Sequence, residues 1–341
     1  MLESIENVKR FVIKTIITAG VGLFLLRKVW IHNRLKNKIV KDLSEKIVII
    51  TGSSDGIGMQ AANELAKMGA TIIFACRDEN KTQRAIAKIR RATNNSKLRY
   101  MHIDLENSAS IKKFADEFKA NYQKLDILIN NAGISLKDRE RKLTSEGHEL
   151  HFAVNYLGHF HLTRLLLNTM KATPSSRIIN VSSELHKRVT FFDMANINLE
   201  IGYSNSTAYR QSKLLQVMFT NHLQRLLDEN GLNIKTVAIS PGFCRTKLIT
   251  GRFSWKTIIN VIQTRLILLL ALPFYYYVSR TAWEGAQVIL YTSVLDFDIL
   301  EKGGYYRDNT SHISSGLARN SALAAELWDI SSNLCNLPRD I

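Results

Sequence analysis

Short β-branched runs alternate with helical segments over most of the chain, and this alternation limits the possible folds more than any other feature. Runs of this kind that are separated by helices form parallel strands covered on both faces. Right-handed crossovers then predict a doubly wound α/β sheet, whose ligand crevice lies beyond the carboxyl ends of the strands. The predicted strands span residues 46–51, 71–76, 98–103, 125–130, 177–182 and 234–240, with a short seventh strand near Tyr305.

The chain has 341 residues, enough for one large domain with its own core. Its hydrophobic fraction of 45% and charged fraction of 22% are typical of a globular protein. The three cysteines, Cys76, Cys244 and Cys335, form no CxxC pair, which favours a reducing compartment over a disulfide framework. We therefore expect a hydrophobic anchor and basic linker over residues 1–43, followed by a single domain over residues 44–341.

The net charge of +16 is unevenly distributed. Residues 1–46 contain ten Lys and Arg against four Asp and Glu, and these charges flank an apolar run at residues 11–26. Basic residues beside an apolar segment suit anionic lipid headgroups. No helix-turn-helix, zinc-finger or RNA-binding signature accompanies the charge, so nucleic acid is not an expected partner.

The apolar run 11–26 predicts a membrane-anchor helix. Its sixteen residues would span about 24 Å, short of the roughly 30 Å of a bilayer core. Lys14 can extend toward the near interface and Trp30 suits the far one, so spanning is possible but marginal. Most of the cations follow the run, which places the large domain in the cytosol by the positive-inside rule. The alternative is a helix that packs on the protein itself.

A glycine-rich sequence follows the first predicted strand and opens a helix that we expect to end near Met68. Glycines let the backbone turn tightly and approach a pyrophosphate, while the helix N-terminus supplies free N–H groups. The spacing is GxxxGxG rather than the GxGxxG of most dinucleotide-binding folds. The predicted cofactor cradle consists of Thr51, Gly52, Ser54, Asp55, Gly56, Ile57 and Gly58.

The second predicted strand ends just before Arg77 and Asp78. At this position, about twenty residues past the last glycine, an acidic residue holds the ribose of NAD and an arginine accommodates the 2′-phosphate of NADP. Arg77 therefore favours NADP(H) over NAD(H). Asp78 keeps the opposite preference open, because a shifted loop could present it instead.

Tyr209 and Lys213 are four residues apart, which on a helix places both on one face. A nearby ammonium favours phenolate, so the pair suits a phenol that acts as acid and base. About 25 residues earlier, a predicted strand ends in the adjacent hydroxyls of Ser182 and Ser183. Successive strand residues face opposite ways, so ordinarily only one of the two points into the crevice.

Together these motifs resemble the fingerprint of the short-chain dehydrogenase/reductase family. Residues 75–78, 155–160 and 283–287 are similar to its microsomal retinol dehydrogenases and retinal reductases, and the resemblance covers nearly everything from residue 46 onward. It implies a Rossmann-type sheet of about seven strands. It also implies hydride transfer between a nicotinamide and a carbonyl or alcohol carbon.

The resemblance further implies a role for individual residues. Tyr209 would donate and accept the proton, and Lys213 would bind the nicotinamide ribose. Ser183 would orient the substrate oxygen, with Ser182 as the alternative, and Asn155 would hold a water of the proton relay. The other cofactor contacts expected from the family are Asp104, Leu105, Asn131, Ala132, Gly133, Pro241, Gly242 and Thr246.

The segment 251–280 is rich in aliphatic and tyrosine side chains and corresponds to the family's substrate loop. Its apolar run is too short to span a bilayer, so we expect a substrate lid or a membrane-contacting segment and a lipophilic substrate. Ordinary core packing is the alternative. A metal site is not expected, because His148, His151, His159 and His161 lack the paired spacing of metal ligands.

The expected activity is the NADP(H)-dependent interconversion of a lipophilic alcohol, such as a retinol or a lipid alcohol, and its aldehyde or ketone. The expected location is the cytosolic face of the endoplasmic reticulum, with a mitochondrial membrane as the alternative. Two other functions stay open: a non-catalytic scaffolding subunit of a membrane complex, and a steroid dehydrogenase.

Overall fold

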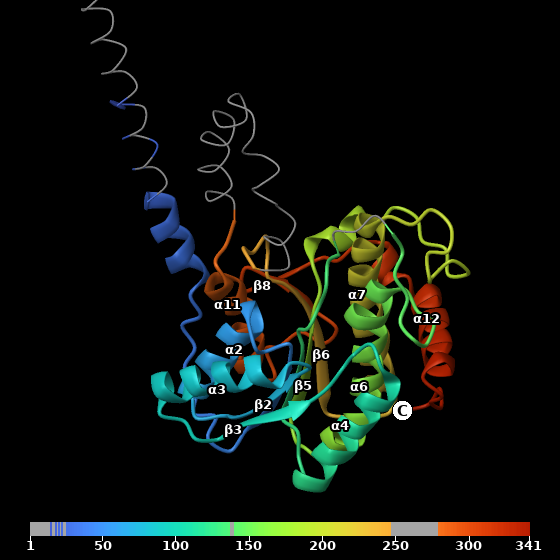
Figure 1. Ribbon diagram of the computed structural model, residues 1–341, viewed down its shortest axis with the longest axis horizontal. Helices are drawn as coiled ribbons and strands as arrows, with labels where there is room; N and C mark the ends of the chain where they lie inside the picture. The colour runs from blue at the N-terminus through green and yellow to red at the C-terminus, as the bar shows by residue number, and fades with distance from the viewer. Residues whose placement is uncertain are drawn as a thin grey trace, which may run out of the picture.

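An eight-stranded sheet runs through the molecule in the order β3-β2-β1-β4-β5-β6-β7-β8 (Figure 1). The computed structural model describes residues 25–136, 140–246 and 279–341, together with Lys14, Thr15, Thr18, Gly20 and Gly22. Strands β1 to β7 are parallel, and the doubly wound fold is confirmed, with the order reversing between β1 and β4. The strands are β1 (Ile47–Thr51), β2 (Thr71–Cys76), β3 (Leu98–His102), β4 (Ile127–Asn130), β5 (Ser176–Val181), β6 (Ile234–Ser240), β7 (Tyr305–Arg307) and β8 (Thr310–His312).

Every predicted strand corresponds to an observed one, with ends that differ by at most two residues. The eighth strand, β8, was not predicted. It is a three-residue edge strand that pairs antiparallel with β7, and all three of its side chains are exposed. A polar strand without a buried face leaves no apolar alternation to detect in the sequence.

Helices cover both faces of the sheet (Figure 1). Val48 and Ile50 of β1 project into the core beneath α2, α3 and α11, whereas Ile49 projects into the core beneath α4, α6 and α7. This two-sided burial explains the continuous apolar strands. The helices are α2 (Gly56–Lys67), α3 (Glu79–Thr93), α4 (Ser108–Asn121), α5 (Leu150–Phe152), α6 (Gly158–Lys171), α7 (Asn205–Glu229), α11 (Ala282–Val294) and α12 (Ser321–Leu334), with 3-10 turns η2 (Glu184–Arg188) and η3 (Leu317–Arg319).

A π-helical turn, η1 (Ala153–Leu157), joins α5 to α6 without a break. Such turns are rare and frequently occur at functional sites. This one contains Asn155, which is fully buried. Gly158, directly after the turn, fits tightly, since a Cβ there would lie 2.6 Å from the carbonyl oxygen of Leu105.

Residues 25–35 form a helix that docks against the beginning of α11 (Figure 1). Lys28 Nζ donates to the carbonyl oxygen of Ser279 at 3.1 Å and lies 3.9 Å from the carboxylate of Glu284. Glu284 also completes a capping box with Thr281 at the start of α11. The helix is thus tied to Ser279 and to the first turn of α11.

The same interface explains the motif at residues 283–287. The rings of His32 and Trp283 stack with centroids 4.3 Å apart. Asn37 N donates to Gln287 Oε1 at 2.9 Å. Trp283 and Gln287 of the motif therefore contact the N-terminal helix and the segment that follows it.

The described residues contain no helix that is both long and apolar enough to cross a bilayer. Most of the predicted anchor run 11–26, and residues 251–278 of the predicted lid, lie outside the described residues.

Candidate active site

A crevice of about 500 Å³ opens at the carboxyl ends of the central strands, where the sequence motifs converge. It lies at the point where the strand order reverses, as expected for a doubly wound sheet. The predicted residues that line it are Gly52, Ser54, Asp55, Gly56, Ile57, Gly58, Arg77, Asp104, Leu105, Asn131, Ala132, Gly133, Tyr209, Lys213, Pro241 and Thr246. The predicted residues outside its lining are Thr51, Asn155, Ser183 and Gly242.

The glycine loop needs its glycines for close approach as well as for backbone conformation. Gly52 has a φ of 65°, and a Cβ there would lie 2.9 Å from the Cα of Ala132. At Gly58 a Cβ would lie 2.4 Å from Asn131 Nδ2. The loop therefore packs directly against the end of β4, which keeps the backbone at the mouth of the crevice free of side chains.

Asp55, an anion in a loop expected to hold phosphates, has two specific partners. One oxygen accepts from Gly56 N at 2.8 Å as the N-cap of α2, and the other lies 3.0 Å from Lys81 Nζ. The lysine offsets the negative charge of Asp55. Lys81 also lines the crevice and was not predicted; its signal was a cation four residues after Arg77, in the first turn of α3.

Arg77 and Asp78 have different roles at the end of β2. The Arg77 side chain is 63% exposed, and its guanidinium lies 2.7 Å from Glu106 and 3.8 Å from Asp104. Asp78 is the N-cap of α3 and accepts from Lys81 N at 2.9 Å. Capping engages one oxygen of the Asp78 carboxylate, and Arg77 and Asp78 both line the crevice.

Thr51 supports the crevice from behind. Its side chain is fully buried, and its hydroxyl oxygen accepts from the backbone N–H groups of Asn131 and Ala132, both at 2.9 Å. The same oxygen lies 2.9 Å from His159 Nε2. Thr51 thus fixes the turn that follows β4, and this turn lines the crevice.

Gly242 lies just outside the crevice, next to Pro241. Its φ is 76°, and a Cβ there would lie 2.7 Å from the guanidinium of Arg280. Thr246, on the same connection, has its methyl group 3.5 Å from the position of a Cβ on Gly56. The connection after β6 therefore meets the glycine loop, as its predicted contact with the cofactor requires.

Tyr209 and Lys213 lie one turn apart in the first half of α7. Lys213 Nζ donates to the carbonyl oxygen of Val181 at 2.8 Å and lies 5.8 Å from the centre of the Tyr209 ring. Burial lowers the pKa of Lys213 to about 8. The structure thus places a buried amine beside a half-buried phenol at the crevice wall.

The two serines after β5 use their hydroxyls differently. Ser182 lines the crevice, but it is buried and its hydroxyl donates to the carbonyl oxygen of Lys213 at 2.7 Å. Ser183 is half-buried, and its oxygen accepts from Leu185 N at 3.2 Å as the N-cap of η2. Accepting this bond leaves the Ser183 proton available for another acceptor.

Asn155 bridges two walls of the crevice. Its Oδ1 accepts from Ile134 N at 2.7 Å, and its Nδ2 donates to the carbonyl oxygen of Ile134 at 3.1 Å and to Ser212 Oγ at 3.0 Å. Ile134 lines the crevice. Asn155 therefore connects the loop after β4 to α7; its role in a water relay stays a prediction.

His151 is a further residue at the site that sequence reasoning did not assign to it. Its buried ring packs edge-on against Tyr209, with centroids 6.4 Å apart. Its Nε2 accepts from Leu136 N at 3.1 Å, so its Nδ1 carries the proton that bonds to Glu149 at 2.8 Å. Among the described residues, no three His, Cys, Asp or Glu side chains are arranged to hold a metal ion.

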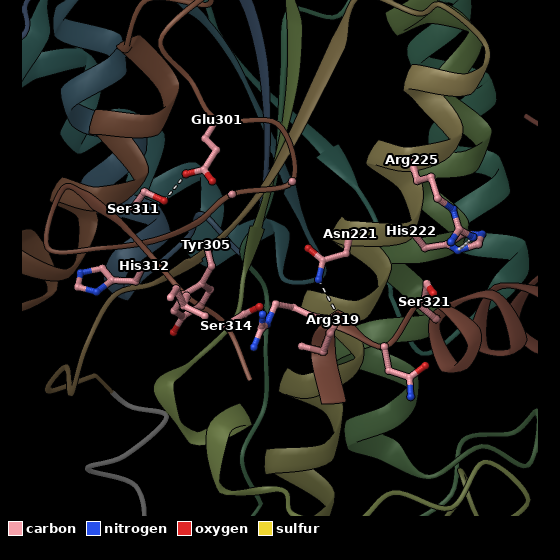
Figure 2. Close-up of a pocket in the computed structure, with 16 residues that line it drawn as sticks. Asn221, His222, Arg225, Glu301, Tyr305, Ser311, His312, Ser314, Arg319 and Ser321 are labelled. Atoms are coloured by element: carbon pink, nitrogen blue, oxygen red, sulfur yellow. Dashed lines mark hydrogen bonds between the residues drawn. The ribbon is translucent and has the colours of Figure 1, made fainter. Parts of the chain in front are cut away.

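A second cavity, of about 480 Å³, lies between α7, the β7–β8 hairpin and the beginning of α12 (Figure 2). It is lined by polar groups such as Arg225, Arg319 and Glu301, whose carboxylate accepts from Ser311. None of the predicted site residues lines it. The crevice is therefore the candidate active site.

Comparisons with known proteins show what the chain is similar to. A family model described as short chain dehydrogenase matches residues 46–257. The chain is 37% identical to retinol dehydrogenase 12 of Bos taurus over 294 residues, which are 86% of this chain and 87% of that protein. It is 35% identical to polyprenol dehydrogenase of Homo sapiens over 295 residues, 85% of each protein.

Among solved structures, L-sorbose reductase from Gluconobacter frateurii aligns with a TM-score of 0.60 at 20% identity. The alignment covers 76% of this chain and 94% of that one. At this identity the likeness shows the fold alone.

Proposed function

Because the chain belongs to the short-chain dehydrogenase family, within its retinol dehydrogenase subgroup, we propose that it is an NADP(H)-dependent oxidoreductase. Its reaction would interconvert a lipophilic alcohol and its aldehyde or ketone. One observation carries the proposal: Tyr209 and Lys213 line the same crevice as the glycine loop. The cofactor, when bound, would supply or accept the hydride.

The residues of the crevice suit a dinucleotide. Its volume of about 500 Å³ is within the usual range of ligand sites. The glycine loop presents bare backbone and the N-terminus of α2, which suit a pyrophosphate. Lys213 and Tyr209 would face the nicotinamide half, and Arg77 would face the adenosine half.

In the reductive direction, the Tyr209 hydroxyl would donate its proton to the substrate oxygen; in the oxidative direction it would take that proton back. The Lys213 ammonium lowers the cost of the phenolate, because an opposite charge nearby favours the ionised phenol. Ser183 would hold the substrate oxygen with the proton that its own capping bond leaves free. Ser182 suits this role less, since its proton is directed to the carbonyl of Lys213.

The preference for NADP(H) rests on charge at the end of β2. Arg77 and Lys81 place two cations along one edge of the crevice, and Asp78 is committed as a helix cap. A 2′-phosphate would meet a planar guanidinium that can bind it in a bidentate manner. The ribose of NAD(H), which carries no 2′-phosphate, would form no ion pair with these cations.

A lipophilic substrate at a membrane is the best-supported choice. The relatives' names, retinol dehydrogenase and polyprenol dehydrogenase, refer to long apolar alcohols. The apolar composition of residues 251–280 and the cation-rich N-terminus suit entry of such an alcohol from a membrane. We therefore propose the cytosolic face of the endoplasmic reticulum as the location.

The test is turnover of purified protein with NADPH and retinal or a medium-chain aldehyde. We expect the wild type to oxidise NADPH and Tyr209→Phe to lose at least about 10²-fold in kcat, the lower range for removal of a general acid. Tyr122→Phe is the matched control, because Tyr122 stacks on Phe118 outside the crevice.

Two results would contradict the proposal. Full activity of Tyr209→Phe would remove the phenol from the reaction. Binding of NADPH by the wild type without turnover of any substrate in an aldehyde, retinoid and steroid panel would indicate the non-catalytic scaffold instead.

A further inference from the structure

Asn155 joins the loop after β4, here called the crevice loop, to α7, here called the catalytic helix because it carries Tyr209 and Lys213. Its side-chain amide bonds to both backbone groups of Ile134 and to Ser212 Oγ. Ser212 Oγ in turn donates to the carbonyl oxygen of Tyr209 at 2.8 Å. A small movement of Asn155 would therefore change the distance between the crevice loop and the first turns of α7.

The main chain of Asn155 is also held. Its carbonyl oxygen accepts from Gln216 Nε2 and lies 3.3 Å from His159 Nδ1. Both side chains are fully buried. The two nitrogens converge on one carbonyl, whose two lone pairs can accept both. They also lie 3.2 Å apart, a hydrogen bond from Gln216 only in the tautomer with no proton on Nδ1. This carbonyl belongs to the π-turn, where the regular pattern of helix hydrogen bonds is interrupted.

The bonds of Thr51 determine which nitrogen of His159 carries the proton. The Thr51 oxygen accepts from two backbone N–H groups, which occupy both of its lone pairs. It can therefore accept nothing from His159. Its own proton has two acceptors within reach, the carbonyl oxygen of Ile129 at 3.4 Å and His159 Nε2 at 2.9 Å, and the shorter distance favours Nε2 as an unprotonated acceptor. The proton of the neutral ring is then on Nδ1, where it faces the carbonyl oxygen of Asn155.

A second proton on this ring is strongly opposed. Burial and the neighbouring Lys213 lower the pKa of His159 to about 3. A protonated ring would also lose its bond from Thr51, because Nε2 could no longer accept. Burial thus favours the neutral ring, and the contact with Thr51 favours the tautomer protonated on Nδ1.

We propose that His159 is a positioning residue: its neutral ring links Thr51, behind the cofactor loop, to the carbonyl of Asn155 on the π-turn, and so fixes the spacing between the crevice loop and the catalytic helix. This inference rests on the proposed oxidoreductase function. The contact of His159 with Thr51 would affect cofactor binding. The contact of His159 with the Asn155 carbonyl would affect the alignment of Tyr209 and Lys213.

Two substitutions separate the two halves of the link. His159→Gln keeps an acceptor near the position of Nε2 for Thr51 but loses the donor to Asn155. His159→Asn keeps a donor near the position of Nδ1 but no longer reaches Thr51. His148→Gln serves as the control, since His148 is half-buried and its ring contacts Phe152 rather than the crevice loop.

Steady-state kinetics and NADPH titration measure the outcome. We expect His159→Gln to lose about tenfold in kcat with nearly unchanged NADPH affinity, the effect of losing one hydrogen bond. We expect His159→Asn to show the reverse, about tenfold weaker NADPH binding with nearly unchanged kcat. Equal losses of both quantities in the two variants, or no loss in either, would overturn the proposal.

A spectroscopic measurement tests the link without any turnover. In protein labelled with ¹⁵N-histidine, the signal that disappears in His159→Gln belongs to His159. We expect it to show a neutral ring protonated on Nδ1, unchanged between pH 8 and pH 5.5. A ring protonated on Nε2, or one that titrates in this range, would overturn the proposal even if the wild type proves inactive; inactivity of the wild type alone would count against the proposed function only.

Discussion

Arg77, directly after β2, and Lys81, in the first turn of α3, both form ion pairs with acidic side chains. Arg77 meets Glu106 and Asp104 near the surface, whereas Lys81 meets Asp55 within the glycine loop. Exposed ion pairs of this kind contribute little to stability. A 2′-phosphate could therefore displace Glu106 from Arg77 at small cost.

This contrast gives a prediction for cofactor choice. Arg77→Ala should raise the Kd of NADPH about tenfold or more, the effect of losing a charge-assisted hydrogen bond, and leave that of NADH nearly unchanged. Fluorescence titration with both nucleotides measures the two constants. Arg99→Ala is the control, because Arg99 lies on β3 and donates to backbone carbonyls there. Equal losses for NADPH and NADH would refute the phosphate contact.

Lys213 shows how the site opposes stability. Its pKa is about 8 in the folded protein and ordinarily 10.5, so the fold pays for burying an ammonium. At about 1.4 kcal/mol per pKa unit this cost is about 3 kcal/mol at pH 7, partly offset by its bond to the Val181 carbonyl. The cost is complete below pH 8 and fades as the pH rises toward 10.5, where the unfolded chain also loses the proton.

Lys213→Met should therefore lose turnover yet melt at an equal or higher temperature than the wild type at pH 7. Its advantage should shrink between pH 8 and pH 10. Thermal denaturation at both ends of this range measures the difference. A variant that melts well below the wild type at pH 7 would show that the amine stabilises the fold.

Residue types and spacing were enough to predict most of the crevice, because glycine loops and the YxxxK pair impose local geometry. They did not predict Lys81, His151 or His159. The roles of these three depend on contacts with Asp55, Tyr209 and Thr51, which are distant in the sequence. A histidine cluster in a sequence does not show which rings will face the site.

At the scale of elements, α11 packs closely against residues of the crevice walls at Gly285. A Cβ on Gly285 would lie 2.4 Å from Cys244 Sγ and 3.3 Å from the Ile57 side chain. Ile57 belongs to the glycine loop, and Cys244 Sγ donates to the carbonyl oxygen of Pro241 at 3.2 Å. A shift of α11 would therefore displace Ile57 and, through Cys244, Pro241, and both residues line the crevice.

Gly285→Ala should destabilise the protein by about 1–3 kcal/mol through overpacking, although alanine is the better helix former. It should also weaken NADPH binding, since Ile57 and Pro241 must move. Gly316→Ala is the control, with nothing within 4 Å of the added methyl group. Chemical denaturation measures the first effect, and addition of Cys244→Ala should restore part of it. Unchanged stability in Gly285→Ala would contradict the fit described here.

The elements differ in how far the sequence predicted them. Strands β1, β2 and β4 to β6 were predicted because buried parallel strands are mostly apolar, whereas the edge strand β3 also carries the exposed Arg99 and His102. The π-turn η1 was not, since residues 150–171 have ordinary helical periodicity and the turn arises from tertiary contacts such as Gly158 against Leu105. The strand β8 was missed because its residues are polar and exposed.

At the scale of the whole molecule, buried histidines make the fold sensitive to acid. Burial lowers the pKa of His159 to about 3 and that of His222 to about 4, both from 6.5. Below pH 6.5 the unfolded chain takes up these protons and the folded chain does not. The free energy of unfolding should therefore fall as the pH decreases, by up to about 1.4 kcal/mol per pH unit for each residue.

Urea denaturation at pH 7.5, 6 and 5 measures this dependence. We expect the free energy of unfolding of His222→Asn to decrease less steeply with falling pH than that of the wild type, because the unfolded variant takes up one proton fewer. An equally steep decrease in His222→Asn would show that other groups are responsible.

The docked helix at residues 25–35 sets the direction in which the catalytic unit points. Contacts at Lys28, His32 and Asn37 hold this helix and the segment that follows it against α11 and Ser279. A surface that binds this helix would therefore also determine the orientation of the crevice relative to that surface. Lengthening the chain between residues 37 and 42 should leave that orientation unchanged, because the contacts of Lys28, His32 and Asn37 remain, whereas Lys28→Ala combined with His32→Ala should release it.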